Sequence, residues 1–119
     1  RTIMSTSKID SYRFGQIVID GQTHNKDVII FPNRVLGGWW RDEGHLLQPN
    51  DLADVFEAKP KMLVVGQGAY GQMAIAPETE QALQSANIEL IALPTEQACQ
   101  TYNNLREQEG TVAALHLTC

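Results

Sequence analysis

The sequence lacks the features of a membrane protein or a nucleic-acid-binding protein. No hydrophobic run approaches the roughly 20 residues of a membrane-spanning helix, and residues 1–8 hold no apolar stretch of signal-peptide length. Lys and Arg total 9 against 14 Asp and Glu, which gives a net charge of −5. The longest basic feature, Lys59 and Lys61 around Pro60, is too small for an electrostatic footprint. Because such a surface repels phosphate and anionic lipid, we expect no nucleic-acid partner and no membrane.

Cysteine and histidine are also scarce. Cys99 and Cys119 cannot build a disulfide framework, and neither stands in a C-x-x-C motif. This usage suits a reducing compartment and predicts a cytoplasmic protein. The three histidines lack H-x-x-x-H spacing, and His116 with Cys119 is only a loose i, i+3 pair. We therefore expect no metal site and no cofactor, and G-x-S-x-G and H-E-x-x-H motifs are absent as well.

The length and composition of the chain are those of one globular domain. It has 119 residues, of which 43% are hydrophobic and 19% charged. A chain of this size can bury about two-thirds of its unfolded surface in one core. We expect a disordered tail at residues 1–8 and a single α/β domain over residues 9–119.

The first half of the chain is predicted to be rich in β-strands. Asp20-Gly21 favours a tight hairpin between residues 15–20 and 22–24, because both residues tolerate positive φ. The segments that follow are a buried strand over 27–31, an irregular tract over 33–50 and a short helix over 51–58.

The second half alternates strands and helices. Strands are predicted over 61–65, 88–93 and 111–117, and helices over 77–86 and 95–108. Short connections in a strand–helix–strand–helix–strand order imply parallel pairing. The expected fold class is therefore α/β, with a mixed β-sheet that combines an N-terminal antiparallel hairpin with a C-terminal βαβαβ unit.

Five tracts occur in an order typical of one known family: Tyr12-Arg-Phe-Gly15, Trp39-Trp-Arg-Asp-Glu-Gly-His45, Val64-Val-Gly-Gln-Gly-Ala-Tyr-Gly71, Thr95-Glu-Gln-Ala98 with Tyr102-Asn103, and His116-Leu-Thr-Cys119. They resemble a family of domains of unknown function. Its relatives include the adipogenesis-associated domain protein and, more distantly, an assembly factor of mitochondrial NADH:ubiquinone oxidoreductase (complex I). The resemblance implies a compact three-layer α/β domain. It implies no reaction, because the family has no established catalytic residues. A role in complex I assembly is not carried over, because the assembly-factor branch lacks the Trp-Trp-Arg tract and the terminal His-x-Thr-Cys.

The glycine-rich loop Gly66–Gly71 matches the G-x-G-x-x-G pattern of dinucleotide sites. Such a site needs its third glycine inside the next helix, so that the helix N-terminus meets the pyrophosphate. Here residues 72–76 intervene before Pro77. The acidic residue that would bind the ribose should end the next strand, whereas Glu89 lies at the start of that strand. We interpret the glycines as turn formers and expect neither NAD nor FAD to bind.

The tract from Trp39 to His45 is the other candidate site. Arg41, Glu43 and His45 have the side chains of an acid–base or ligand-binding set. Alternatively, Arg41 is paired structurally and the tryptophans cap the core beneath a loop. Both interpretations stay open on the sequence alone.

Parallel pairing predicts that these candidates meet at one edge of the sheet, where ligands of open α/β sheets bind. The edge would combine residues 66–71, 94–95 and 116–119. The candidate ligand- or partner-binding residues are Arg41, His45, Gly66, Gly68, Tyr70, Thr95 and His116.

Two functions fit this prediction. We favour a non-enzymatic binding or assembly module, because no complete catalytic set is present. The alternative is a small enzyme or ligand-binding protein that uses the edge formed by 66–71, 94–95 and 116–119. The partner is accordingly an unknown protein or a small molecule, and the oligomeric state is left open. An exposed apolar patch would favour the module, whereas a deep polar pocket would favour the alternative.

Overall fold

The computed structural model of the chain describes residues 7–119, so most of the tail expected at residues 1–8 lies outside the described residues. Within the described part, no helix is long and apolar enough to cross a membrane. The elements follow in the order β1 (Ile9–Arg13), β2 (Gln16–Ile19), β3 (Gln22–His24), β4 (Val28–Phe31), β5 (Arg34–Gly37), β6 (Leu46–Leu47), the 3₁₀ helix η1 (Pro49–Leu52), α1 (Ala53–Ala58), β7 (Met62–Gln67), β8 (Ala74–Ile75), α2 (Pro77–Ser85), β9 (Glu89–Leu93), α3 (Thr95–Leu105) and β10 (Thr111–His116).

The centre of the molecule is a five-stranded sheet in the order β5-β4-β10-β7-β9. β10 and β9 flank β7 and both run parallel to it. α2 connects β7 to β9, and α3 connects β9 to β10. The predicted βαβαβ unit with its parallel strands is therefore confirmed.

The antiparallel part of this sheet comes from β4 and β5. β4 pairs antiparallel with β10, and β5 pairs antiparallel with β4. The prediction of an irregular tract over residues 33–50 was wrong in part, because residues 34–37 form β5 and residues 46–47 form β6. Only Val35 and Leu36 are apolar in β5, and two glycines follow them, so the local sequence hides a strand that its neighbour β4 stabilises.

The N-terminal strands form a separate three-stranded sheet in the order β1-β2-β3. The predicted hairpin turn is confirmed: Asp20 and Gly21 have φ of 49° and 78°, which suits a two-residue turn between β2 and β3. β1 was not predicted as a strand. It pairs with β2 and brings Ile9 into the core.

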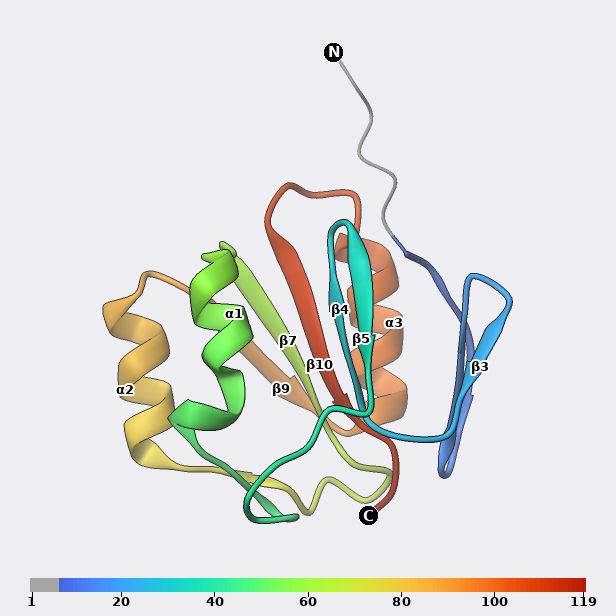
Figure 1. Ribbon diagram of the computed structural model, residues 1–119, viewed down its shortest axis with the longest axis horizontal. Helices are drawn as coiled ribbons and strands as arrows, with labels where there is room; N and C mark the ends of the chain where they lie inside the picture. The colour runs from blue at the N-terminus through green and yellow to red at the C-terminus, as the bar shows by residue number, and fades with distance from the viewer. Residues whose placement is uncertain (1–6) are drawn as a thin grey trace.

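The side chains of the central sheet alternate between two hydrophobic cores, as the period of a strand requires. Leu63 and Val65 of β7 pack with α1 and α2 on one face. Val64, between them, packs with α3 and the small sheet on the other face. Figure 1 shows the result, with α1 and α2 in front of the sheet and α3 behind it. The compact three-layer α/β fold is thus confirmed.

Candidate functional site

Four strand ends meet at one side of the central sheet, which we call the carboxyl edge. It contains the ends of β7, β9 and β10, the start of β4, and the segments 38–45, 68–71 and 117–119 that adjoin them. In Figure 1 these segments lie at the bottom of the molecule, close to the C-terminus. The predicted shared edge therefore exists. β4 runs antiparallel to β10, and for that reason its first residues lie at the carboxyl edge too.

Asp27, which directly precedes β4, is the centre of this edge. One carboxylate oxygen, Oδ2, lies 2.7 Å from Nη1 of Arg41 and 2.8 Å from Nδ1 of His116. The other, Oδ1, accepts a 2.8 Å hydrogen bond from the backbone N–H of Leu117. One carboxylate thus holds a loop residue and the end of β10 in place. We call Asp27, Arg41 and His116 the ionic cluster.

Arg41 reaches the cluster because the chain turns back after β5. Its side chain is 5% exposed, and Nη2 donates a 3.0 Å hydrogen bond to the carbonyl of Gly44. The guanidinium carbon lies 4.8 Å from the centre of the Trp39 ring, which is cation–π distance. Arg41 is therefore engaged by a carboxylate, a carbonyl and an aromatic face.

His116, the last residue of β10, completes the ionic cluster. Nδ1 lies 2.8 Å from Asp27 and 3.0 Å from Nη2 of Arg41. Because an ionised carboxylate can only accept a hydrogen bond, the 2.8 Å contact with Asp27 places a proton on Nδ1, which donates to the carboxylate. The Nε2 atom of His116 is buried without a partner among the described residues, as is Nε of Arg41. The ring of His45 stands edge-on to that of His116, with 6.2 Å between the ring centres.

Two opposed effects act on the Asp27 carboxyl. Burial alone would raise its pKa, because it disfavours the charged form. The hydrogen bonds from His116, the Leu117 amide and Arg41 favour the charged form and outweigh burial, so the pKa of Asp27 lies below its ordinary value. The carboxylate therefore stays ionised beside Arg41 at neutral pH.

The glycine loop and the C-terminal tail are held together by Thr95. Its hydroxyl donates to the carbonyl of His116 and accepts a 2.8 Å hydrogen bond from the N–H of Gly68. Its own N–H donates to the Gly68 carbonyl over 3.0 Å. A Cβ on Gly66 would lie 2.8 Å from the Thr95 hydroxyl oxygen, so this glycine allows the close approach. Four predicted site residues, Gly66, Gly68, Thr95 and His116, thus contact one another through local bonds and packing.

Tyr70 and His45 lie at the same edge but outside the ionic cluster. Tyr70 is 70% exposed, and its ring centre lies 6.1 Å from that of Phe14 in the turn between β1 and β2. That turn abuts the tail, because the Gly15 N–H donates to the Leu117 carbonyl over 2.9 Å. His45 is exposed. The structure therefore divides the predicted site residues into a buried set and an exposed set.

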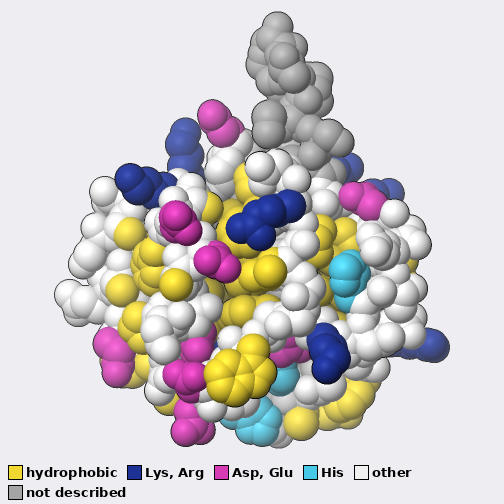
Figure 2. Space-filling view, viewed as in Figure 1, with side chains coloured by type: hydrophobic (Ala, Val, Ile, Leu, Met, Phe, Trp, Pro, Cys, Tyr) yellow, Lys and Arg dark blue, Asp and Glu magenta, His cyan; other side chains and the backbone are white. Residues whose placement is uncertain are grey.

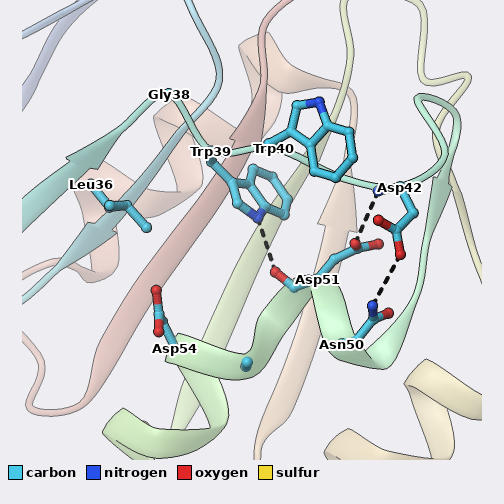
Figure 3. Close-up of a pocket in the computed structure, with 9 residues that line it drawn as sticks. Leu36, Gly38, Trp39, Trp40, Asp42, Asn50, Asp51 and Asp54 are labelled. Atoms are coloured by element: carbon cyan, nitrogen blue, oxygen red, sulfur yellow. Dashed lines mark hydrogen bonds between the residues drawn. The ribbon is translucent and has the colours of Figure 1, made fainter.

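A cavity of about 300 Å³ opens beside the carboxyl edge, between the segment that follows β5 and the η1–α1 region. Figure 3 shows the two adjacent tryptophans over its centre, with Leu36 and Asp54 on one side and Asp42 and Asn50 on the other. Its lining residues are Leu36, Gly38, Trp39, Trp40, Asp42, Asn50, Asp51, Ala53 and Asp54.

The glycine loop does not have the geometry of a dinucleotide site. β7 extends to Gln67, and β8 intervenes before α2 begins at Pro77. Gly68 and Gly71 have φ of 97° and 68°, so they serve the turn, as predicted. The amides at the start of α2 therefore do not follow the third glycine, as pyrophosphate binding by this motif requires.

The cysteines differ in their surroundings. Cys99 on α3 is 6% exposed in the core beneath the small sheet. Burial, with a smaller contribution from Glu96, raises the pKa of its thiol to about 12. Cys119 is partly exposed and free. Among residues 7–119, no group of three His, Cys, Asp or Glu side chains is arranged to hold a metal ion.

Sequence reasoning missed Asp27 as a site residue and placed it in a buried strand. The available signal was topological: a charged residue that opens an antiparallel neighbour of β10 must lie beside the end of β10. Nor could the different exposure of the two tryptophans be predicted: Trp39 is 7% exposed and Trp40 76%.

Comparison with known proteins places the chain in a group without an assigned function. Residues 9–117 match the family described as "Protein of unknown function (DUF498/DUF598)". A conserved hypothetical protein of Pyrococcus horikoshii is 28% identical, with a TM-score of 0.81 over 94% of this chain and 99% of its own. A Rhodopseudomonas palustris protein is also 28% identical, with a TM-score of 0.74 over 98% and 90%.

A third similar structure is described as a Mth938-like domain. This Bordetella pertussis protein is 21% identical, with a TM-score of 0.70 over 98% of this chain and 90% of its own. At that identity the likeness shows the fold alone. The three structures span nearly the whole chain, and the fold they share is the one described above.

Proposed function

This chain belongs to the DUF498/DUF598 family of proteins of unknown function, and we propose that it is a non-enzymatic binding or assembly module that docks a protein at its carboxyl edge. One observation carries the proposal. Among the described residues the exposed large hydrophobic side chains are Phe14, Trp40 and Tyr70, at 55%, 76% and 70%. Trp40 and Tyr70 belong to the segments of this edge, and the Phe14 ring lies beside that of Tyr70. Exposed aromatic side chains gathered in one region are typical of protein-binding surfaces, because their burial releases much apolar area.

The space-filling view supports this proposal. At the lower edge of Figure 2, hydrophobic side chains are exposed beside histidine and acidic side chains. That part of the molecule corresponds to the carboxyl edge in Figure 1. A docking surface with an apolar centre and a polar rim has this composition.

The buried ionic cluster acts, in this proposal, as the support of the docking surface. Asp27 fixes Arg41, whose neighbour Trp40 is exposed, and it fixes the backbone of Leu117, which the Phe14-Gly15 turn contacts. A rigid support lowers the entropy cost of ordering aromatic side chains on binding. Arg41 and His116 thus contribute by position, whereas Trp40, Tyr70 and Phe14 contact the partner.

The same contacts argue against the alternative of a small enzyme at residues 66–71, 94–95 and 116–119. The Thr95 hydroxyl and the Gly68 backbone are hydrogen-bonded within the protein. The unpartnered Nε2 of His116 is the one observation in favour of a ligand there, and it is buried.

The resemblance to an assembly factor is a further reason to propose a protein partner. Complex I itself is not part of the proposal, because the assembly-factor branch lacks the Trp-Trp-Arg tract found here at residues 39–41. We also propose a cytoplasmic location, because Cys99 and Cys119 are both free thiols.

Affinity capture with a matched variant tests the proposal. The tagged full chain and its F14S/W40S/Y70S variant are each exposed to native lysate, and the retained proteins are compared by quantitative mass spectrometry. We expect the chain to retain specific proteins and the variant to lose them at least about tenfold, since that corresponds to about 1.4 kcal/mol. Each substitution should change the free energy of unfolding by about 1 kcal/mol or less, because the side chains are exposed.

The control variant is Q84S/E109S, which changes two exposed residues away from the carboxyl edge. It should retain the same proteins as the unmodified chain. Equal retention by the aromatic variant would overturn the proposal. If the eluate instead holds a bound small molecule that Arg41→Ala releases, the ligand-binding alternative is correct.

A further inference from the structure

The cavity beside Trp40 has aromatic walls and an acidic rim. Trp39 and Trp40 line it together with Leu36, and the Nε1–H of Trp39 is fixed by a 3.0 Å hydrogen bond to the carbonyl of Asp51. Three carboxylates, those of Asp42, Asp51 and Asp54, belong to the same lining. Figure 3 shows them on both sides of the tryptophans. The cavity therefore offers flat apolar surface and negative charge at once.

The three carboxylates form no ion pair with any described residue. Asp51 accepts hydrogen bonds from the N–H groups of Gln48 and Asp42, and Asp42 accepts one from the Asn50 side chain. These donors are neutral, so the negative charges remain uncompensated. Asp54, in the first turn of α1, has no hydrogen bond among the described residues. A cation would bring to this cavity the charge that the protein does not supply.

The chain itself shows how such walls hold a guanidinium group. A few residues away, Arg41 lies 4.8 Å from the Trp39 ring while its Nη1 contacts the Asp27 carboxylate at 2.7 Å. An aromatic face and a carboxylate together satisfy a planar guanidinium, which stacks on rings and binds carboxylates through its fork of N–H groups. The cavity repeats this combination with Trp40 exposed and with the charge of Asp54 unpaired.

We propose that this cavity binds an arginine side chain of the partner protein. The inference rests on the proposed function, because it names the chemistry of one contact between the partner and the carboxyl edge. Trp40, at 76% exposure, provides the stacking surface, while Asp54 and Asp42 provide the charge. Trp40 belongs to both the docking surface and the cavity, so the arginine is placed at the border of the interface.

The test is a titration of ¹⁵N-labelled protein with N-acetyl-arginine methylamide. Binding is monitored by NMR through the indole N–H signals of the tryptophans. The sequence has only two tryptophans, both of which line the cavity, so these signals report on the site directly. We expect saturable chemical-shift changes of the indole signals with a Kd in the millimolar range, which corresponds to a binding free energy on the order of 4 kcal/mol. The matched neutral compound, N-acetyl-citrulline methylamide, should bind at least about fivefold more weakly because it lacks the charge.

Variants of the same helix separate a local contact from general attraction by the acidic protein. Asp54→Asn should weaken arginine binding about threefold or more, whereas Glu57→Gln, which removes the same charge outside the cavity lining, should change it less than about twofold. Equal binding of the citrulline compound, equal loss in both variants, or no saturation up to about 50 mM would overturn the inference. Free arginine binding about tenfold more tightly than the capped compound would also overturn it, because the ligand would then be a small molecule.

The two proposals fail separately. If the arginine compound does not bind while the F14S/W40S/Y70S variant still loses its partners, the arginine pocket is wrong and the docking surface stands. If the compound binds as expected but the aromatic variant retains every partner, the cavity is a cation site that does not serve the proposed docking.

Discussion

At the scale of single residues, Asp27 determines how the carboxyl edge is organised. Its carboxylate contacts both the end of β10 and the loop that follows β5. Buried charges are costly unless they are paired, and the pair here is also hydrogen-bonded on both carboxylate oxygens. The cluster therefore contributes to the position of the loop more clearly than to net stability.

Asp27→Asn should destabilise the fold because it leaves the Arg41 guanidinium buried without a counter-charge. We expect the free energy of unfolding to fall by about 3 kcal/mol at neutral pH, measured by urea denaturation. Asp54→Asn serves as the control, since Asp54 is exposed and its substitution should stay within about 0.5 kcal/mol. Equal free energies of unfolding for the two variants would show that the ionic cluster does not support the carboxyl edge.

The same substitution predicts a pH dependence with a definite sign. The pKa of Asp27 is lowered in the folded state, so the stabilisation it provides is complete above the unfolded pKa of about 3.9 and is lost as the pH falls through the folded value. The stability difference between the unmodified protein and Asp27→Asn should therefore narrow below about pH 4. A difference that stays constant from neutral to strongly acidic pH would contradict this assignment.

Cys99 and Cys119 should react very differently with thiol reagents. Burial raises the pKa of the Cys99 thiol to about 12, and the thiolate is the reactive form. We expect labelling of Cys119 in the native protein and of Cys99 only after unfolding, as resolved by peptide mapping. Cys99→Ser should cost roughly 1–2 kcal/mol, because it buries a hydroxyl in an apolar site. Rapid native labelling at position 99 would show that α3 opens.

At the scale of elements, the glycine loop binds the C-terminal tail through hydrogen bonds and close packing. The N–H of Ala69 donates to the carbonyl of Thr118 over 2.7 Å, beside the bonds between Gly68 and Thr95. A Cβ on Gly68 would lie 2.6 Å from the carbonyl oxygens of Thr118 and Cys119. The loop and the tail therefore fix each other, and both adjoin the ionic cluster through His116.

Gly68→Ala should displace the tail. The added Cβ would be strained at a φ of 97° and would also clash with backbone atoms 2.6 Å away. We therefore expect the free energy of unfolding to fall by roughly 2–4 kcal/mol. Gly21→Ala is the matched control: its φ is 78°, but nothing lies within 4 Å of the added Cβ. It should cost only about 1 kcal/mol. An equal decrease in the free energy of unfolding of both variants would mean that the tail moves away from the added Cβ at no energetic cost.

The second half of the fold could be predicted from sequence because its elements are long and their local residue patterns agree with the structure they form. The three parallel strands are apolar, and both helices begin at or beside a proline. β1 and β5 could not be predicted in this way. β5 is half-buried at its two central residues and exposed at both ends, and it depends on its pairing with β4. In β1, the residues other than Ile9 and Tyr12 are polar or charged. Their strand structure comes from tertiary pairing, which composition does not reveal.

At the scale of the whole molecule, topology explains which parts of the carboxyl edge could be predicted from the sequence and which could not. Parallel strands place residues 68, 95 and 116 together whatever their side chains are, so their meeting could be predicted. Burial of a given side chain depends on how the 38–45 segment folds back, and no local pattern encodes this. Arg41 was therefore predicted at the correct edge, while its partner Asp27 was missed.

The course of the chain after the glycine loop also predicts that NAD and FAD do not bind. β8 separates the loop from α2, so no helix N-terminus follows the third glycine. Equilibrium dialysis should show no retention of either nucleotide at micromolar concentration. Measurable micromolar affinity would require a rearrangement of residues 72–76 and would contradict the structure described here.

Site-specific photo-crosslinking in living cells tests the docking surface most directly. A benzophenone amino acid is incorporated at position 14, 40 or 70, and for comparison at the exposed positions 84 and 109. The docking surface predicts discrete covalent adducts with a protein partner from positions 14, 40 and 70 and none from 84 and 109. Adducts of equal yield from all five positions, or none from the three aromatic positions, would contradict the claim that the carboxyl edge binds a partner.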